Sequence, residues 1–90
     1  MRPEDPDVVR LLGIANGASG NHSKAIELLT KFTQLKPNNA QGFLALGTSF
    51  LNSGRMSEGL AALTKANQLE PNDSNILRMI EIAKNNNSIQ

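Results

Sequence analysis

The chain lacks several residue types on which enzymes and small stabilised scaffolds depend. Its 90 residues contain no cysteine, tryptophan or tyrosine, and only one histidine. Without cysteine there is neither a disulfide framework nor a thiolate metal site, and the cellular compartment stays undetermined. The aromatic residues are Phe32, Phe43 and Phe50. A small domain with this largely aliphatic core should be only modestly stable unless neighbouring structure contributes.

The sequence also lacks long apolar runs and concentrated charge. Its apolar runs are a few residues long, and polar residues follow Met1, so neither a membrane-spanning helix nor a signal peptide is predicted. Nine basic and eight acidic residues give a formal charge of +1, unlike the positive field of most nucleic-acid-binding proteins. No run of like charge favours a membrane surface. We expect neither a nucleic-acid partner nor direct membrane insertion, and the localisation is left open.

Catalytic and metal-binding patterns are equally scarce. His22 stands at the start of a predicted helix without clustered ligands, so we expect an exposed side chain and not a catalytic or metal-binding one. The carboxylates are scattered, with no pair placed for acid–base work. Asp5 and Asp7 suit helix capping better than chelation, and the glycines between residues 13 and 20 follow no strand, which argues against a phosphate loop. We therefore predict no catalytic residue, no metal site and no cofactor.

What the sequence does contain is an internal repeat. The stretch from Asn39 to Asp73 predicts a helix–turn–helix unit, and a shift of 34 residues (71 − 37 = 34) places it on a second copy. Four matches set this register: Pro71 with Pro37, Leu46-Gly47 with Leu12-Gly13, Gly54 with Gly20, and Leu63 with Leu29. The expected helix caps recur in the same phase, at Asp5, Asn39 and Asp73. The period predicts helix pairs that stack side by side.

Apolar periodicity, caps and breakers predict five helices, at about 6–18, 22–35, 40–53, 56–69 and 74–86. The first helix is apolar over a wide face, which predicts burial on more than one side. Gly47 costs about 1 kcal/mol of helix stability relative to alanine, as does Gly42, so another helix should pass close by. Gly59 is a small residue where the fourth helix would cross. Arg55 is a poor N-cap.

The repeated residues resemble the tetratricopeptide repeat. The resemblance covers two repeats, 6–39 and 40–73, and makes helix 74–86 similar to the first helix of a third repeat. The signature positions hold Val9, Leu12, Gly13, Asn16, Ala25, Leu29, Phe32 and Pro37, then Phe43, Leu46, Gly47, Phe50, Gly59, Leu63, Ala66 and Pro71. Asn16 replaces a usual aromatic residue, and Phe32 and Gly59 replace usual alanines.

The resemblance implies an all-α, right-handed solenoid of antiparallel helix pairs, with two repeats followed by a C-terminal capping-type helix. The domain is expected to span residues 6–86, between a disordered lead over 1–5 and a frayed tail over 87–90. By resemblance the function is that of a non-catalytic adaptor or scaffold, which presents a concave groove to an extended peptide or a partner protein.

Groove positions carried over from the family hold Arg10, Ile14, Leu44, Thr48, Leu51, Asn52, Arg78 and Ile82. An apolar strip with an arginine near each end suits a peptide with aliphatic side chains and a carboxylate. The alternative is that the apolar members of this set only fill space between neighbouring helices. In family members that bind chaperone tails, a clamp of lysine, arginine and asparagine holds the terminal carboxylate. Its positions here carry Arg10, Ile14, Ala45, Asn75 and Met79, so we expect weak or no binding of such tails.

Two other functions remain open. Leu77 and Ile80 occupy positions that would pack on a helix following the fifth, so they are expected to be covered by a second copy or by further repeats. Two repeats and one helix fall below the usual minimum of about three repeats, which points the same way. A pentatricopeptide-type repeat that binds RNA is less compatible with the period and the near-neutral charge. The identity of the partner is not predicted.

Overall fold

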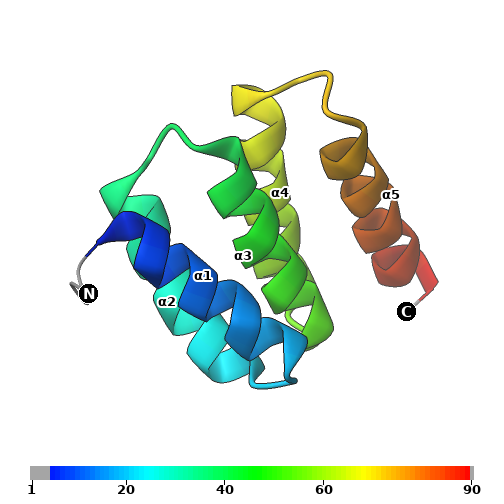
Figure 1. The fold of residues 1–90 in the computed structure, drawn as a ribbon. Coiled ribbons are helices and arrows are strands. Elements are labelled where there is room, and N and C mark those ends of the chain that lie inside the picture. The colour runs from blue at the N-terminus through cyan, green and yellow to red at the C-terminus, as the bar shows by residue number, and fades with distance from the viewer. Residues whose placement is uncertain (1–4, 90) are drawn as a thin grey trace.

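The structure is a computed structural model that describes the backbone of residues 5–89 and the side chains of residues 5–85. The described residues form five helices and no strand: α1 (Pro6–Ala18), α2 (His22–Leu35), α3 (Ala40–Asn52), α4 (Met56–Leu69) and α5 (Ser74–Ile89). In Figure 1, α1 with α2 and α3 with α4 form two antiparallel pairs that stand side by side, and α5 lies beyond the second pair. The predicted all-α arrangement of stacked helix pairs is confirmed.

The helices begin where the sequence offers a side-chain acceptor. The Asp5 carboxylate accepts a hydrogen bond from the Asp7 N–H at 2.9 Å, and the Asn39 side chain accepts one from the Gly42 N–H at 3.0 Å. Asp73 caps α5 by accepting from two backbone N–H groups, at 2.9 and 3.1 Å. These bonds satisfy backbone donors that the first helical turn leaves unpaired. The predicted caps therefore mark the start of each repeat.

Helix α4 begins differently. Arg55 makes no side-chain cap. Its guanidinium instead donates two hydrogen bonds of 2.7 Å to the Glu58 carboxylate and lies 5.0 Å from the centre of the Phe50 ring. Gly54, just before it, has a φ of +82°, which a residue with a side chain rarely adopts. The turn is thus held by the glycine and by the paired arginine, and not by a cap.

The core is a layer of small and aliphatic side chains between successive helices. One cluster joins α2 to α3 and α4 through Ala25, Leu29, Leu46, Phe50 and Ala62. Two further clusters fix α5: Ala40, Ala66 and Ile76, and then Leu51, Leu63 and Ala83. Helices α3, α4 and α5 therefore each bury apolar side chains against the helix before them.

Glycines allow α3 and α4 to cross at short range. A Cβ at Gly47 would lie 2.8 Å from the Leu63 Cγ and 3.1 Å from the Gly59 carbonyl oxygen. A Cβ at Gly59 would lie 2.6 Å from the Leu51 Cδ2. Such distances are below van der Waals contact, so a side chain at either position would push the helices apart. The packing role predicted for these glycines is confirmed.

Helix α1 departs from its prediction, because it is covered on one side only. Leu11, Leu12 and Ile14 are 57%, 48% and 43% exposed, whereas Leu46, which corresponds to Leu12 in the second repeat, is 7% exposed. Leu46 packs on α2, but no described helix precedes α1 to do the same for Leu12. Burial at this repeat position therefore depends on a neighbouring helix and not on the residue type.

The predicted helix ends agree closely with the observed ones. Helix α3 ends at Asn52, one residue before the prediction, and α5 continues to Ile89 where an end near residue 86 was expected. Residues 1–4 of the predicted lead and Gln90 of the predicted tail lie outside the described residues. No helix in the described range has the length and apolar character needed to cross a membrane.

Replacing Gly47 by alanine tests the close crossing. The gain in helix propensity is about 1 kcal/mol, but overpacking of a core contact costs about 1–3 kcal/mol. We expect Gly47→Ala to lower the free energy of unfolding, measured by urea denaturation. Gly17→Ala is the matched control, because its Cβ would stand at ordinary contact distance, 3.6 Å from Ala25 and Ser49. Equal or greater stability of Gly47→Ala than of Gly17→Ala would contradict this account.

Candidate functional site

An open cleft lies between α1 and α3, the first helices of the two repeats. Its volume is about 550 Å³, within the range of sites that hold small ligands. Its lining comes from Arg10, Ile14, Gly17, Ala18, Leu29, Gln41, Leu44, Ala45, Thr48, Ser49 and Asn52. Figure 1 shows α1 and α3 next to each other on one face of the molecule, with α2 and α4 behind them. The cleft is therefore a product of stacking the two repeats.

The repeat places the lining side chains in rungs. Arg10 corresponds to Leu44, Ile14 to Thr48, and Ala18 to Asn52, each separated by 34 residues (44 − 10 = 34). Within each helix these residues are four apart, so they share one face. Because α1 and α3 are equivalent helices of successive repeats, the two faces lie side by side along the cleft. The resulting strip has an arginine at one end and an asparagine at the other.

Apolar and polar side chains alternate along the cleft, and each end carries one polar residue from the paired positions, Arg10 or Asn52. Ile14 is 43% exposed, while Leu44 is partly buried and also packs against the core clusters around α5. Arg10 is partly buried, and it is the charged residue of the described lining. The Thr48 hydroxyl donates to the Leu44 carbonyl at 2.8 Å, so its proton is already used within α3. Arg10 at one end and the exposed Asn52 at the other therefore offer the side-chain donors.

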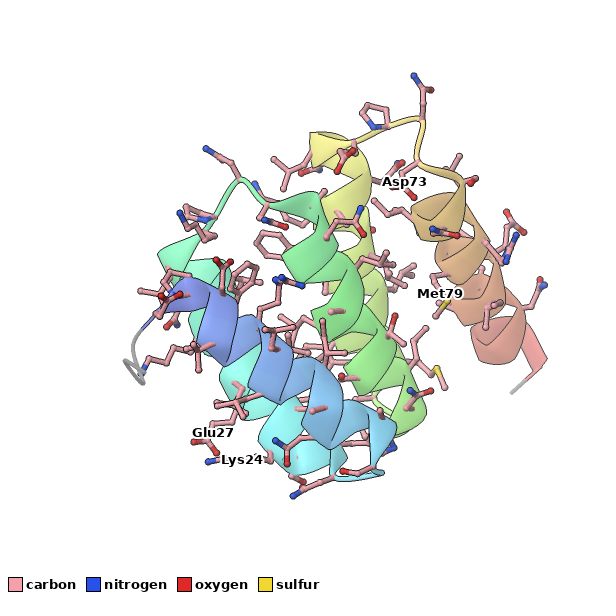
Figure 2. All side chains as sticks on the ribbon, viewed as in Figure 1. Lys24, Glu27, Asp73 and Met79 are labelled. Atoms are coloured by element: carbon pink, nitrogen blue, oxygen red, sulfur yellow. The ribbon has the colours of Figure 1, made fainter. Side chains whose placement is uncertain are left out.

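A second polar contact lies at the Arg10 end of α3. The Gln41 side-chain amide donates a hydrogen bond of 3.1 Å to the Asp73 carboxylate, which also caps α5. Figure 2 shows Asp73 at the loop that leads into α5. Gln41 thus lines the cleft and also links α3 to the start of α5. One residue connects the candidate site to the packing of α5.

Five of the eight predicted groove residues line this cleft: Arg10, Ile14, Leu44, Thr48 and Asn52. Leu51 does not, because its side chain is 8% exposed and packs with Leu63 and Ala83 in the core. Its assignment to the groove is corrected to a packing role. Arg78 and Ile82 are exposed on α5, outside the cleft. Helix α5 packs mainly on α4 and touches α3 only slightly, which keeps these two residues apart from the rest.

Several lining residues were not predicted. Gln41, Ala45 and Ser49 form a second stripe with a spacing of four, next to the stripe of Leu44, Thr48 and Asn52. That spacing was readable in the sequence once the first stripe had been placed. Leu29 reaches the cleft from α2, and only the tertiary packing reveals it.

The residues predicted as an oligomer face have different surroundings. Leu77 is 44% exposed, as expected. Ile80 is partly buried and packs against both core clusters that join α5 to α4. It therefore faces its own chain, and the expectation that it awaits an outside partner is corrected. Met79, labelled in Figure 2, is likewise partly buried and packs against the cluster of Leu51, Leu63 and Ala83.

The remaining polar features are structural in character. His22 was expected to be exposed but is partly buried, and its Nδ1 atom is enclosed without a hydrogen-bond partner. Among the described residues, no group of three or more histidine, aspartate and glutamate side chains could hold a metal ion. The ion pair between Lys24 and Glu27, labelled in Figure 2, spans 3.5 Å on an exposed surface, where such pairs contribute little stability.

Comparison with known proteins gives a clear result for the fold alone. No protein-family model and no curated protein matches this chain. The Sgt2 TPR domain from Aspergillus fumigatus matches with a TM-score of 0.89 and 24% identity, over 96% of this chain and 58% of that one. The structure described as MamA MSR-1 C2 matches with a TM-score of 0.87 and 26% identity, over 96% of this chain and 49% of that one.

A mutant form of MamA matches similarly, with a TM-score of 0.86 and 26% identity, over 96% of this chain and 63% of that one. The chain thus spans less than two thirds of the length of each of these structures. The expected resemblance is confirmed at the level of the fold, and such neighbours suggest a module for protein–protein interaction. The described residues have the tetratricopeptide-repeat fold.

Proposed function

We propose that this chain is a non-catalytic interaction module, an adaptor or scaffold that holds an extended peptide segment in the cleft between α1 and α3. The observation that supports this most directly is the ladder of paired positions along the cleft, with Ile14 left 43% exposed at its centre. An apolar side chain exposed in a concave site, flanked by polar groups, is typical of a binding surface.

The lining defines the chemistry of the partner. Ile14, Ala18 and the accessible part of Leu44 would contact aliphatic side chains. The Arg10 guanidinium would pair with a carboxylate through charge-assisted hydrogen bonds. Asn52 would donate to and accept from the peptide backbone at the other end. The partner is therefore an extended segment with aliphatic side chains and an acidic group near one end.

The same lining supports a binding role over catalysis. The described residues around the cleft include no histidine, carboxylate or lysine, the side chains that most often move protons in enzymes. Arginine stays protonated at neutral pH and serves as an anchor for anions. We therefore retain the inference that the chain is not an enzyme, with a protein or peptide as its partner.

Reversing the charge of Arg10 tests the electrostatic part of the proposal. Peptides selected from a display library of random linear peptides should carry aliphatic residues and an acidic group. Arg10→Glu should weaken their affinity at least tenfold, about 1.4 kcal/mol, measured by calorimetry. Lys31→Glu makes the same charge change on an exposed part of α2, away from the cleft, and should leave the affinity unchanged. Equal losses in the two variants would indicate long-range attraction without a site.

Paired alanine substitutions separate binding from packing. Ile14→Ala should lower the affinity for the selected peptides. It should change the free energy of unfolding by less than about 1 kcal/mol, because Ile14 is partly exposed. Leu51→Ala should cost about 2–5 kcal/mol of stability, because Leu51 is buried. A large loss of stability for Ile14→Ala, with unchanged peptide affinity, would favour the alternative that the strip only fills space between helices.

Chaperone tails that end in aspartate should bind weakly or not at all. Of the positions that form the clamp in family members, Arg10, Ile14 and Ala45 line the cleft, and only Arg10 can hold a carboxylate. Asn75 is exposed at the start of α5, and Met79 packs in the core. A calorimetric titration with such a tail peptide checks this expectation. Low-micromolar affinity would show that the clamp needs fewer residues than we infer.

A further inference from the structure

One apolar face of α1 is largely uncovered within the described chain. It consists of the exposed Leu11, Leu12 and Ala15 and the partly buried Val8, and we call it the α1 edge. Leu11 and Leu12 are 57% and 48% exposed. These residues hold the repeat positions at which later helices dock on the helix before them. The α1 edge is thus a docking face without a partner in the described chain.

Helix α5 shows what such a face does when a partner is present. Two periods along the chain (76 − 8 = 68), the α1 edge corresponds to Ile76, Met79, Ile80 and Ala83. In the structure these α5 residues dock on α4: Ile76 packs with Ala66, and Ala83 packs with Leu63. Compared with α5, the α1 edge has valine in place of Ile76 and leucine in place of both Met79 and Ile80. Alanine stands at the position of Ala83 in both helices. The α1 edge therefore carries nearly the same apolar surface that α5 places on α4.

The two docking interfaces within the chain are not interchangeable. Helix α2 presents Phe32 to Gly42 of α3, where a Cβ would lie 2.5 Å from the phenyl ring. Helix α4 presents Ala66, which corresponds to Phe32, to the fully buried Ile76, which corresponds to Gly42. A branched side chain thus fits on α4, whereas on α2 a side chain at this position would overlap the Phe32 ring. Val8 holds this position in α1, so the α1 edge fits α4 and clashes with α2.

Polar residues around the face follow the same correspondence. Asp73 accepts a hydrogen bond from Gln41 of α3, and its counterpart in α1 is another N-cap aspartate, Asp5. Arg78 corresponds to Arg10. In α3 the equivalent residues are Asn39 and Leu44, so α1 resembles α5 more closely than it resembles α3. Docking of α1 in place of α5 would conserve the hydrogen bond to Gln41 and the charge of the arginine.

We propose that the occupant of the α1 edge is a second copy of this chain, whose α4 accepts α1 in place of its own α5. The contact joins two different surfaces, so it would extend the stack head to tail. It would also add the first repeat of one copy beside α3 of the next, which lengthens the cleft. Helix α5 then acts as an intramolecular cover: its tether gives it an effective concentration in the millimolar range, so the intact chain stays monomeric at micromolar concentration.

Weakening α5 in the full-length chain tests the proposal. Ile76→Ser removes the apolar group that α5 buries most fully against Ala66. We expect self-association at least about tenfold tighter than that of the unmodified chain, measured by sedimentation velocity. Adding Leu12→Glu to this variant should abolish the association. The matched control adds Leu77→Ser instead, on the exposed side of α5, and this change should leave the association intact.

Cysteine cross-linking identifies the surfaces, since the natural chain has no cysteine. A chain with Val8→Cys is mixed with one carrying Ala66→Cys, both with Ile76→Ser. A mixed disulfide supports the proposal, because this bond requires the two Cβ atoms to approach closely. Predominant pairing of the cysteine at position 8 with itself would show α1-to-α1 contact and overturn it. If the Ile76→Ser variants stay helical but remain monomeric at high concentration, the proposal is overturned as well.

A variant that loses its helices in circular dichroism is replaced by Ala83→Asp, which weakens the same α4–α5 contact at its other end. Should both variants unfold, the cysteine pair is placed in the otherwise unmodified chain and mixed at millimolar concentration. There the docked α5 competes directly with the second copy. Failure to form the mixed disulfide under those conditions would overturn the proposal.

Discussion

The structure depends on one constraint: a helix pair of this composition exposes too much apolar surface to stand alone. Val9 and Gly13 of α1 are buried against α2, yet the outer side of that pair still requires cover. The second repeat is covered on both sides. Helix α2 packs on Leu46, and helix α5 packs on Leu63. Stacking is therefore the source of stability, and each helix is only as buried as its neighbours allow.

Small residues make that stacking compact. At the crossing of α3 and α4, Gly47 and Gly59 bring backbone and leucine side chains within contact distance. Between repeats, Gly42 accommodates Phe32, while Ala66 accommodates Ile76. Both interfaces pair one large residue with one small residue. The large residue lies on α2 in the first interface and on α5 in the second. This difference gives each docking face a preferred partner, because protein interiors tolerate neither overlap nor voids.

The candidate site follows from the same geometry. Successive first helices lie side by side, so residues one period apart line the same cleft, and Arg10, Ile14 and Asn52 share it without any local motif. The cleft places one arginine and several apolar side chains along a single strip, and its described lining includes no histidine, carboxylate or lysine. A partner that matches this pattern would be recognised by shape and charge along an extended segment.

The helices, their caps and the period could be predicted from the sequence, because they depend on interactions within a few residues. Asp5, Asn39 and Asp73 cap in the structure as the sequence predicts, and three rungs of the cleft follow from the period. Which apolar residues are covered could not be predicted in this way, because it depends on the packing of helices far apart in the sequence. Leu51 is buried by α4 and α5, Ile80 is partly buried against the core clusters, and Leu12 is exposed where its counterpart Leu46 is not. Burial depends on whether a neighbouring helix packs on the residue. The residue type at a repeat position does not show whether that helix is present.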